Sequence, residues 1–316
     1  MRNCKTVPPS EQEKINILKR YVTAKTDTRL YNRLKYAGFY RLRLYARFLS
    51  SKSHILKTKP SEDVLYSLYE FDEKLRLLLF VFCKKAEISL KSAVSSSCTQ
   101  REQNSLFYAC RESYTPTKGT VDKLTRQKNI TYFEYYLDGI LDEEQKVRTD
   151  VSKYPEIHKS RPDGKNSADR LPADVLFSYL DFGSVCKMYS YLRGDLRKEI
   201  LRYGYTRKNY GKETTKQFDT WLDAIRNLRN SCAHHNILIG KTSNVILPEF
   251  GEDSLLKSRT DLFSRLYALK KVLPENQGKA LGSALSRLIS HSKTEVYRLG
   301  ILPSDWKEKY DSIRFL

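Results

Sequence analysis

The chain has 316 residues, of which 40% are hydrophobic, so it is long and apolar enough to bury a sizeable core. Lysine and arginine number 57 against 37 aspartates and glutamates, which leaves a formal net charge of +20. A positive charge of this size attracts polyanions, so nucleic acid is the first candidate partner and an anionic membrane surface the second. The sequence contains no run of about 18 apolar residues, so we expect no membrane span.

The first residues carry no apolar segment of the kind found in signal peptides, so we expect a cytoplasmic protein. The cysteines are scattered and include no C-x-x-C pair, which favours reduced thiols and gives no spacing suited to zinc. They are Cys4, Cys83, Cys98, Cys110, Cys186 and Cys232. We expect neither a metal nor any other cofactor.

The N-terminal third of the chain predicts helices in close succession. Ser10 is placed to cap a helix over 10–25, and a second stretch over 28–50 is expected to break at Gly38. The clearest element follows over 61–98, with Ser61 as its cap and acidic residues in its first turn. Its core-facing positions recur at the spacing of an amphipathic helix about ten turns long. These positions are Leu65, Leu68, Phe71 or Asp72, Leu75, Leu78 or Leu79, Phe82 and Ala86.

The rest of the chain also reads as helical. Further helices are predicted over 124–147, 172–192, 194–203, 214–235, 254–273, 279–297 and 303–312. A polar loop is expected over 153–170, and at most a small hairpin near 240–250. The sequence therefore predicts an all-α fold. Its expected regions are an N-terminal basic and aromatic region (1–60), a helical core (61–240) with a variable insertion at about 101–170, and a C-terminal helical extension (241–316), possibly all one compact unit.

The segment IRNLRNSCAHHN, residues 225–236, carries the candidate chemistry. Cleavage of RNA requires a proton to leave the ribose 2′-hydroxyl and another to reach the departing 5′-oxygen, and a histidine such as His234 can move either one. The guanidinium of Arg229 can hold the negative charge that gathers on phosphorus. Asn230 could orient either the histidine or the phosphate.

The spacing of this motif sets a geometric condition. Residues five apart on an ideal helix are separated by about 140°, so Arg229 and His234 do not share a helical face. They can act together if the helix ends or distorts between them, or if a second copy supplies one group. A homodimer would also provide two histidines, one as acid and one as base. The alternative is structural: a solvated arginine, a histidine at a helix terminus, and His235 as an ordinary neighbour.

Four ordered segments resemble the Abi-like abortive-infection family of the AbiD/AbiF type, a branch of the HEPN superfamily. The RNSCAHHN segment is similar to the R-N-x-x-A-H-H signature of that family. The other three segments are LKYAGFYRLRLYARF (34–48), LYSLYEFDEKLRLLLFVFCKKAEISLKSAV (65–94) and LPADVLFSYLDFGSVCKMYSYL (171–192). The resemblance covers roughly residues 30–240. It departs from the family pattern at Ala173 and Asp174, where a tryptophan is usual, and in the residues after Asn236.

This resemblance implies a HEPN-like helical core with N-terminal and C-terminal helical extensions, and a role in phage defence. It also implies metal-independent RNA cleavage that leaves a 2′,3′-cyclic phosphate, and association with a structured non-coding RNA. Arg229, Asn230 and His234 match the catalytic motif. Glu87 matches the acidic position of the long helix and, with His235, is a candidate supporting residue.

Two basic segments are candidates for contact with RNA. The first, residues 32–48, alternates cations with aromatic rings, which can neutralise phosphates and stack on unpaired bases; about half of the rings must face the core, so we expect the arginines to matter more. Its candidates are Arg33, Lys35, Arg41, Arg43, Arg47 and Tyr40. The second, residues 193–212, contributes Arg197, Lys198, Arg202, Arg207, Lys208 and Lys212.

These observations lead to an RNA-binding protein of an abortive-infection system, with RNA cleavage that is latent or conditional. Two alternatives remain open. One is a free toxin endoribonuclease that has no RNA partner, and the other is a catalytically inactive protein that holds RNA in a structural particle.

Overall fold

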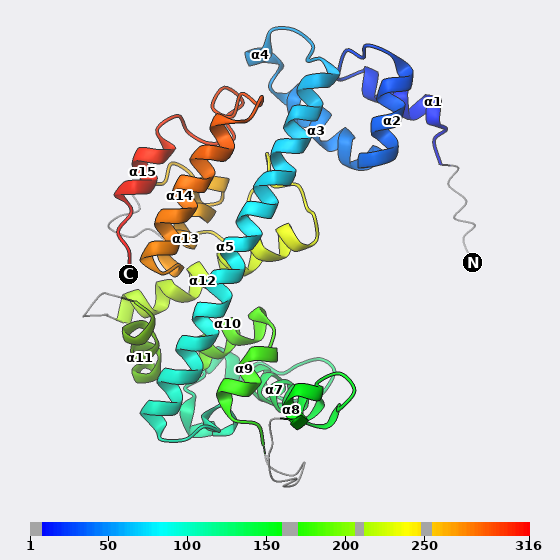
Figure 1. The fold of residues 1–316 in the computed structure, drawn as a ribbon. Coiled ribbons are helices and arrows are strands. Elements are labelled where there is room, and N and C mark those ends of the chain that lie inside the picture. The colour runs from blue at the N-terminus through cyan, green and yellow to red at the C-terminus, as the bar shows by residue number, and fades with distance from the viewer. Residues whose placement is uncertain (1–7, 160–169, 206–211, 248–254) are drawn as a thin grey trace.

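The computed structural model describes residues 8–159, 170–205, 212–247 and 255–316. The fold is all-α, as predicted, and the described residues contain isolated bridges but no strand. Helix α5 (Glu62–Glu102) runs nearly the whole length of the molecule (Figure 1). Helices from all three predicted regions pack against it, namely α3, α9, α10, α11, α12, α13 and α14. None of the helices in the described ranges is both long enough and apolar enough to cross a bilayer.

The length of α5 follows from its sequence. Ser61 caps it by accepting the backbone N–H of Val64, and Glu62 and Asp63 lie in its first turn, where the helix dipole favours negative charge. Its 41 residues include neither glycine nor proline and span about 60 Å at 1.5 Å per residue. The predicted core-facing positions from Leu65 to Ala86 are buried, and buried residues continue to Cys98, so the helix has a core contact at almost every turn. It continues four residues beyond the predicted end and stops at Gln103, whose φ is +50°.

The N-terminal helices gather at the beginning of α5 (Figure 1). They are α1 (Glu11–Lys19), α2 (Asp27–Ala37), α3 (Phe39–Ser51) and the short α4 (Ser53–Leu56). The predicted cap at Ser10 is present as a full capping box with Glu13. The predicted break at Gly38 is also present, with a φ of +80° that favours glycine.

The C-terminal half of α5 is surrounded by shorter elements (Figure 1). They are the 3₁₀ turns η1 (Phe107–Ala109) and η2 (Arg111–Ser113), α6 (Lys118–Val121), α7 (Tyr132–Thr149), α8 (Pro155–Lys159), α9 (Ala173–Tyr179), α10 (Phe182–Tyr191), α11 (Gly194–Gly204) and α12 (Lys212–Ala233). The last helices, α13 (Leu262–Val272), α14 (Glu275–Ser290) and α15 (Trp306–Ser312), lie along the other part of α5.

Some predicted boundaries were wrong, because side-chain caps begin helices where the apolar pattern alone shows no break. The single helix predicted over 172–192 is two helices, since Asp181 caps α10 by accepting the N–H of Ser184. The helix predicted from 124 begins at Tyr132, after a capping box between Thr131 and Glu134. The first C-terminal helix begins at Leu262, capped by Asp261. Of the hairpin region, residues 240–247 form no strand, and 248–250 lie outside the described residues.

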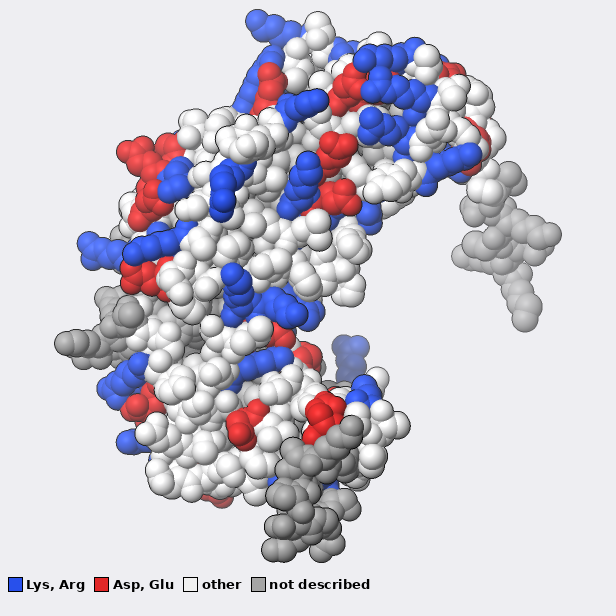
Figure 2. All heavy atoms as spheres, in the orientation of Figure 1, with Lys and Arg blue, Asp and Glu red and all other residues white. Residues whose placement is uncertain are grey.

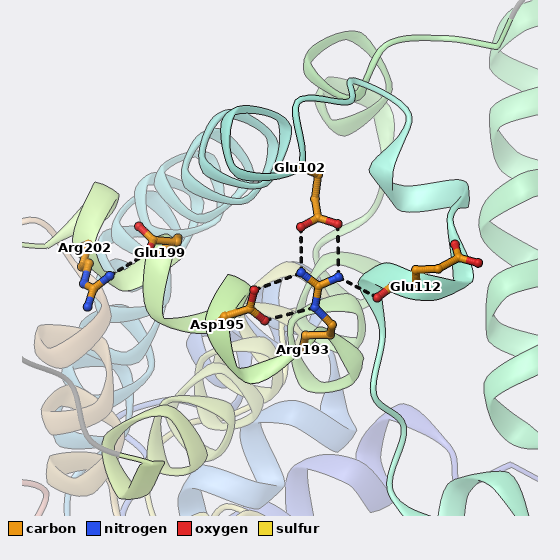
Figure 3. A network of polar contacts seen from close by, with 6 residues as sticks. All are labelled: Glu102, Glu112, Arg193, Asp195, Glu199 and Arg202. Carbon is orange, nitrogen blue, oxygen red and sulfur yellow. Dashed lines mark hydrogen bonds and ion pairs between the residues drawn. The ribbon is translucent and has the colours of Figure 1, made fainter.

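Arg193 joins three elements at the end of α5 (Figure 3). Its Nη1 and Nη2 atoms bind the two carboxylate oxygens of Glu102 at 3.2 and 2.8 Å, and Nε and Nη2 bind Asp195 at 3.1 and 3.0 Å. Nη1 also donates to the carbonyl of Glu112 at 2.8 Å, so all five donors of the guanidinium are used. These bonds raise the pKa of Arg193 and hold the pKa of the Asp195 carboxyl below its usual value. The end of α5, η2 and the start of α11 are thereby fixed together.

We expect Arg193→Lys to lower the free energy of unfolding by about 1–3 kcal/mol, because an ammonium cannot serve two carboxylates and a carbonyl at once. Urea denaturation measures the change. Arg202→Lys is the matched control, since Arg202 is about half exposed and pairs only with Glu199 among the described residues of this network, and its change should stay within about 0.5 kcal/mol. Equal effects of the two substitutions would contradict this account.

Candidate nucleic-acid interface

The candidate motif lies at the C-terminal end of α12, where it packs beside the middle of α5 (Figure 1). The helix was predicted to reach residue 235, but it ends at Ala233. The N–H of His235 bonds to the carbonyl of Cys232 at 3.1 Å and that of Asn236 to Ser231 at 2.8 Å, which is a Schellman motif. His235 has a φ of +54°, so it occupies the left-handed position that usually takes glycine. Its side chain therefore follows the turn and not the helix.

Arg229 is held against α5 by Glu87. The Nε atom of Arg229 lies 3.6 Å from Glu87 Oε2, and Glu87 Oε1 lies 2.8 Å from the Nζ of Lys91. Glu87 is 9% exposed, so its charge needs both cations. Arg229 also donates to the side-chain oxygen of Asn230 at 3.2 Å, and its guanidinium lies 5.9 Å from the centre of the Phe80 ring. The structure thus brings together Arg229, Asn230 and Glu87 from the sequence-predicted site.

His234 does not join this group. Its N–H donates to the carbonyl of Asn230 at 3.0 Å, so helical geometry persists up to this residue and the separation of about 140° from Arg229 applies. The imidazole is exposed and makes no hydrogen bond with the described part of the chain. Arg229 therefore faces α5, while His234 faces solvent.

A pocket of about 680 Å³ opens beside the Arg229–Glu87 pair. It is formed by α5, α9 and α12. It is lined by Phe80, Lys84, Glu87, Ile88, Lys91, Ser92, Ser95, Ser96, Asp174, Phe177, Ser178 and Arg229. Three cations face two carboxylates there, and four serine hydroxyls add neutral hydrogen-bonding groups. Cations with hydroxyl donors around a partly apolar floor can hold a phosphate group together with part of a sugar or base.

The segment that follows the motif is fixed by a buried carboxylate. Asp72 of α5 is fully buried, and its Oδ1 accepts the backbone N–H groups of Leu238 at 3.2 Å and Ile239 at 3.1 Å. Its Oδ2 accepts a hydrogen bond from the hydroxyl of Tyr45 at 2.5 Å and forms an ion pair with the guanidinium of Arg76. The Arg76 side chain is only 3% exposed. Burial and the Asp72 carboxylate raise the pKa of the Tyr45 phenol, so it remains a donor. One carboxylate thus connects α3, α5 and the segment after α12.

Tyr45, Asp72 and Arg76 were not among the predicted site residues. The signal was nevertheless in the sequence. Asp72 shares a core-facing position of the predicted helix with Phe71, and Arg76 follows it by four residues on the same face. A carboxylate and an arginine spaced this way on an apolar face indicate a buried pair, because neither charge is stable there alone.

The cations of the first basic segment are mostly engaged with nearby rings. Arg33 lies 3.6 Å from the centre of the Tyr66 ring, Lys35 lies 4.4 Å from that of Tyr31, and Arg43 lies 6.0 Å from that of Phe39. Arg41 lies beside Tyr69. Burial raises the pKa of the Tyr69 phenol, and Arg41 partly offsets that rise. Arg47 is exposed, and so is Tyr40, at 74%. Among the candidates of this segment, Lys35, Arg47 and Tyr40 are exposed, whereas Arg33, Arg41 and Arg43 are partly buried.

The second basic segment is partly structural. Arg197 is 16% exposed on its side chain, donates to the Thr215 carbonyl at 2.5 Å and forms an ion pair with Asp219, so it fastens α11 to α12. Arg202 pairs with Glu199 at 2.6 Å at the surface, and Lys198 is partly exposed. Arg207 and Lys208 lie outside the described residues, as does the side chain of Lys212.

Lysine and arginine side chains gather over the N-terminal helices and again near the middle of the same face (Figure 2). The outline of the molecule is hollowed between its two ends on this side. The site thus consists of a paired arginine beside a pocket of three cations and two carboxylates at the end of α12, in an all-α fold. The chain belongs to the Abi-like protein family, whose model matches residues 32–240. Membership points to a role in abortive infection, a defence against phage. No curated protein matches the chain, and no solved structure does.

We expect Asp72→Ala to lower the free energy of unfolding by about 3–5 kcal/mol, because it leaves Arg76 buried without its partner. The amide protons of Leu238 and Ile239 should then exchange faster with solvent, as followed by hydrogen–deuterium exchange. Tyr45→Phe removes one donor and keeps the ion pair, so it should cost less, about 1–3 kcal/mol. If the exchange of these two amides were unchanged in both variants, Asp72 would not be what fixes this segment.

Proposed function

We propose that this protein acts in abortive infection by binding RNA, with a phosphate of the RNA in the pocket between α5, α9 and α12. The observation that carries the proposal is the chain of ion pairs from Lys91 through Glu87 to Arg229 on the wall of that pocket. Glu87 fixes the direction of the arginine side chain through Nε, and one Nη1 donor binds Asn230, so the remaining Nη donors are available to a ligand. The net charge of +20 adds long-range attraction for a polyanion.

The bound RNA is proposed to be a structured non-coding transcript. The family resemblance implies such a partner, and the spread of positive charge along one face suits an RNA that extends over several helices (Figure 2). Sequencing the nucleic acid that co-purifies with the protein would identify the transcript.

A second candidate function is metal-independent RNA cleavage, which the free imidazole of His234 favours. In this reaction the ribose 2′-oxygen forms a bond to phosphorus while the bond from phosphorus to the 5′-oxygen breaks. A histidine takes the proton of the 2′-hydroxyl, and a second group returns a proton to the leaving oxygen. Arg229 would hold the charge on phosphorus. Because Arg229 and His234 face apart, a second copy of the chain is proposed to complete the site.

Binding is tested by removing the pocket cations. Lys84→Ala with Lys91→Ala should weaken binding of a labelled RNA hairpin at every sequence tried, and should lower the salt slope of the affinity by about 1–2. The matched control is Lys279→Ala with Lys307→Ala, which removes the same charge from α14 and α15, where each lysine pairs within its own helix. Fluorescence anisotropy measures both. Equal losses in the two double variants would place the RNA elsewhere.

Cleavage is tested with EDTA present throughout. We expect His234→Ala to lower the rate about 10²–10⁴-fold and Arg229→Ala to have an effect of similar order. Since both serve one transition state, the double variant should be little worse than the worse single one. His235→Ala is the matched control and should be milder. Activity that survives His234→Ala, or that EDTA abolishes, would contradict this mechanism. A wild-type protein that binds RNA and never cleaves it is a binding protein alone.

A further inference from the structure

We infer that the junction of α2 and α3 is a stacking platform for unpaired RNA nucleotides, with Tyr36 and Tyr40 as its two rings. The inference rests on the proposed RNA binding and names the part of the RNA that this end of the molecule takes. It differs from the pocket at Arg229, which takes a phosphate.

Exposure sets these two tyrosines apart from the other rings. Tyr36 is 79% and Tyr40 is 74% exposed, the highest values for any large hydrophobic side chain in the described ranges. In the same segment Tyr45 is fully buried, and Phe39 and Phe48 pack against the core. A ring left in water gains none of the stability that burial gives, so the core does not explain why tyrosines stand at these two positions.

The backbone holds both rings on ordered helices. Tyr36 lies in the last turn of α2 and Tyr40 in the first turn of α3. Gly38 lies between them. Its N–H donates to the carbonyl of Leu34 at 2.9 Å at the end of α2, and its carbonyl accepts the N–H of Leu42 at 3.1 Å at the start of α3. Because the backbone is already ordered, only the side-chain torsions of the two rings lose freedom when a base stacks on them.

The surroundings of the two rings suit a polyanion. Residues 28–61 contain nine lysines and arginines and no aspartate or glutamate. Arg47 on α3 is exposed, and Lys35 and Arg41 adjoin the two tyrosines in sequence. Positive side chains gather at this end of the molecule, with acidic side chains among them (Figure 2). An occupant that brings both negative charge and flat faces is a nucleic acid strand, and its base faces are accessible only where it is unpaired.

The experiment compares an unstructured single-stranded RNA of roughly 12 nucleotides with a blunt duplex of the same sequence, by fluorescence anisotropy. Tyr36→Leu and Tyr40→Leu keep apolar bulk and remove the flat ring, so each should weaken single-strand binding roughly 5- to 100-fold and leave duplex binding unchanged. Tyr36→Phe and Tyr40→Phe keep the ring and should bind almost as wild type does. Tyr135→Leu on α7, 44% exposed at the other end of the molecule, is the control.

Several results would overturn the inference. Leucine variants that bind the single strand as wild type does, or that lose the duplex equally, would show that no base stacks there. Phenylalanine variants as weak as the leucine variants would assign the effect to the hydroxyl groups. Leucine variants that keep RNA affinity but lose a co-purifying protein would make this a protein-binding surface. A wild type that binds neither RNA would overturn the proposed function itself, a result distinct from all of these.

Discussion

The buried carboxylate of Asp72 is the interaction on which the arrangement of the candidate site depends. It receives the hydroxyl of Tyr45 from α3, the guanidinium of Arg76 from α5, and two backbone N–H groups from the segment after α12. A buried charge is stable only when its partners are all in place, so these parts must assemble together. Helix α3, α5 and the segment after α12 are therefore fixed to one another at this carboxylate.

The excess of positive charge is divided between structure and surface. Arg76 binds Asp72 and the hydroxyl of Tyr45 on α3, Arg193 joins the start of α11 to the end of α5, and Arg197 joins α11 to α12. Residues 28–61 contain no acidic residue, and the acids that pair with Arg29 and Arg33 come from α5. The proposed RNA surface is therefore argued from the local excess of cations in this stretch and not from the number of arginines alone.

Much of the fold could be predicted because helix caps and apolar periodicity depend on neighbouring residues. The site could be predicted less well because it depends on contacts between residues far apart in the sequence. The caps at Ser10 and Ser61, the break at Gly38 and the periodicity of residues 61–98 each depend on residues within one or two turns, and all are present. The role of Arg197 depends on Asp219, 22 positions away, and nothing within its own helix indicates it. The end of α12 is set locally by its Schellman motif, whereas the position of the segment that follows depends on Asp72, more than 160 residues earlier.

The two residues of the Arg-x4-His motif point away from α12 in different directions. Arg229 is held toward α5 by Glu87, which needs that cation to remain buried, so its position is a property of the folded chain. His234 has no such partner among the described residues and extends from the last helical position into solvent. Binding of a phosphate requires only the first residue, whereas cleavage requires both residues at one phosphorus atom. Of the two proposed functions, RNA binding therefore needs only one chain, whereas cleavage would need a histidine brought to the phosphate that we propose for the Arg229 pocket.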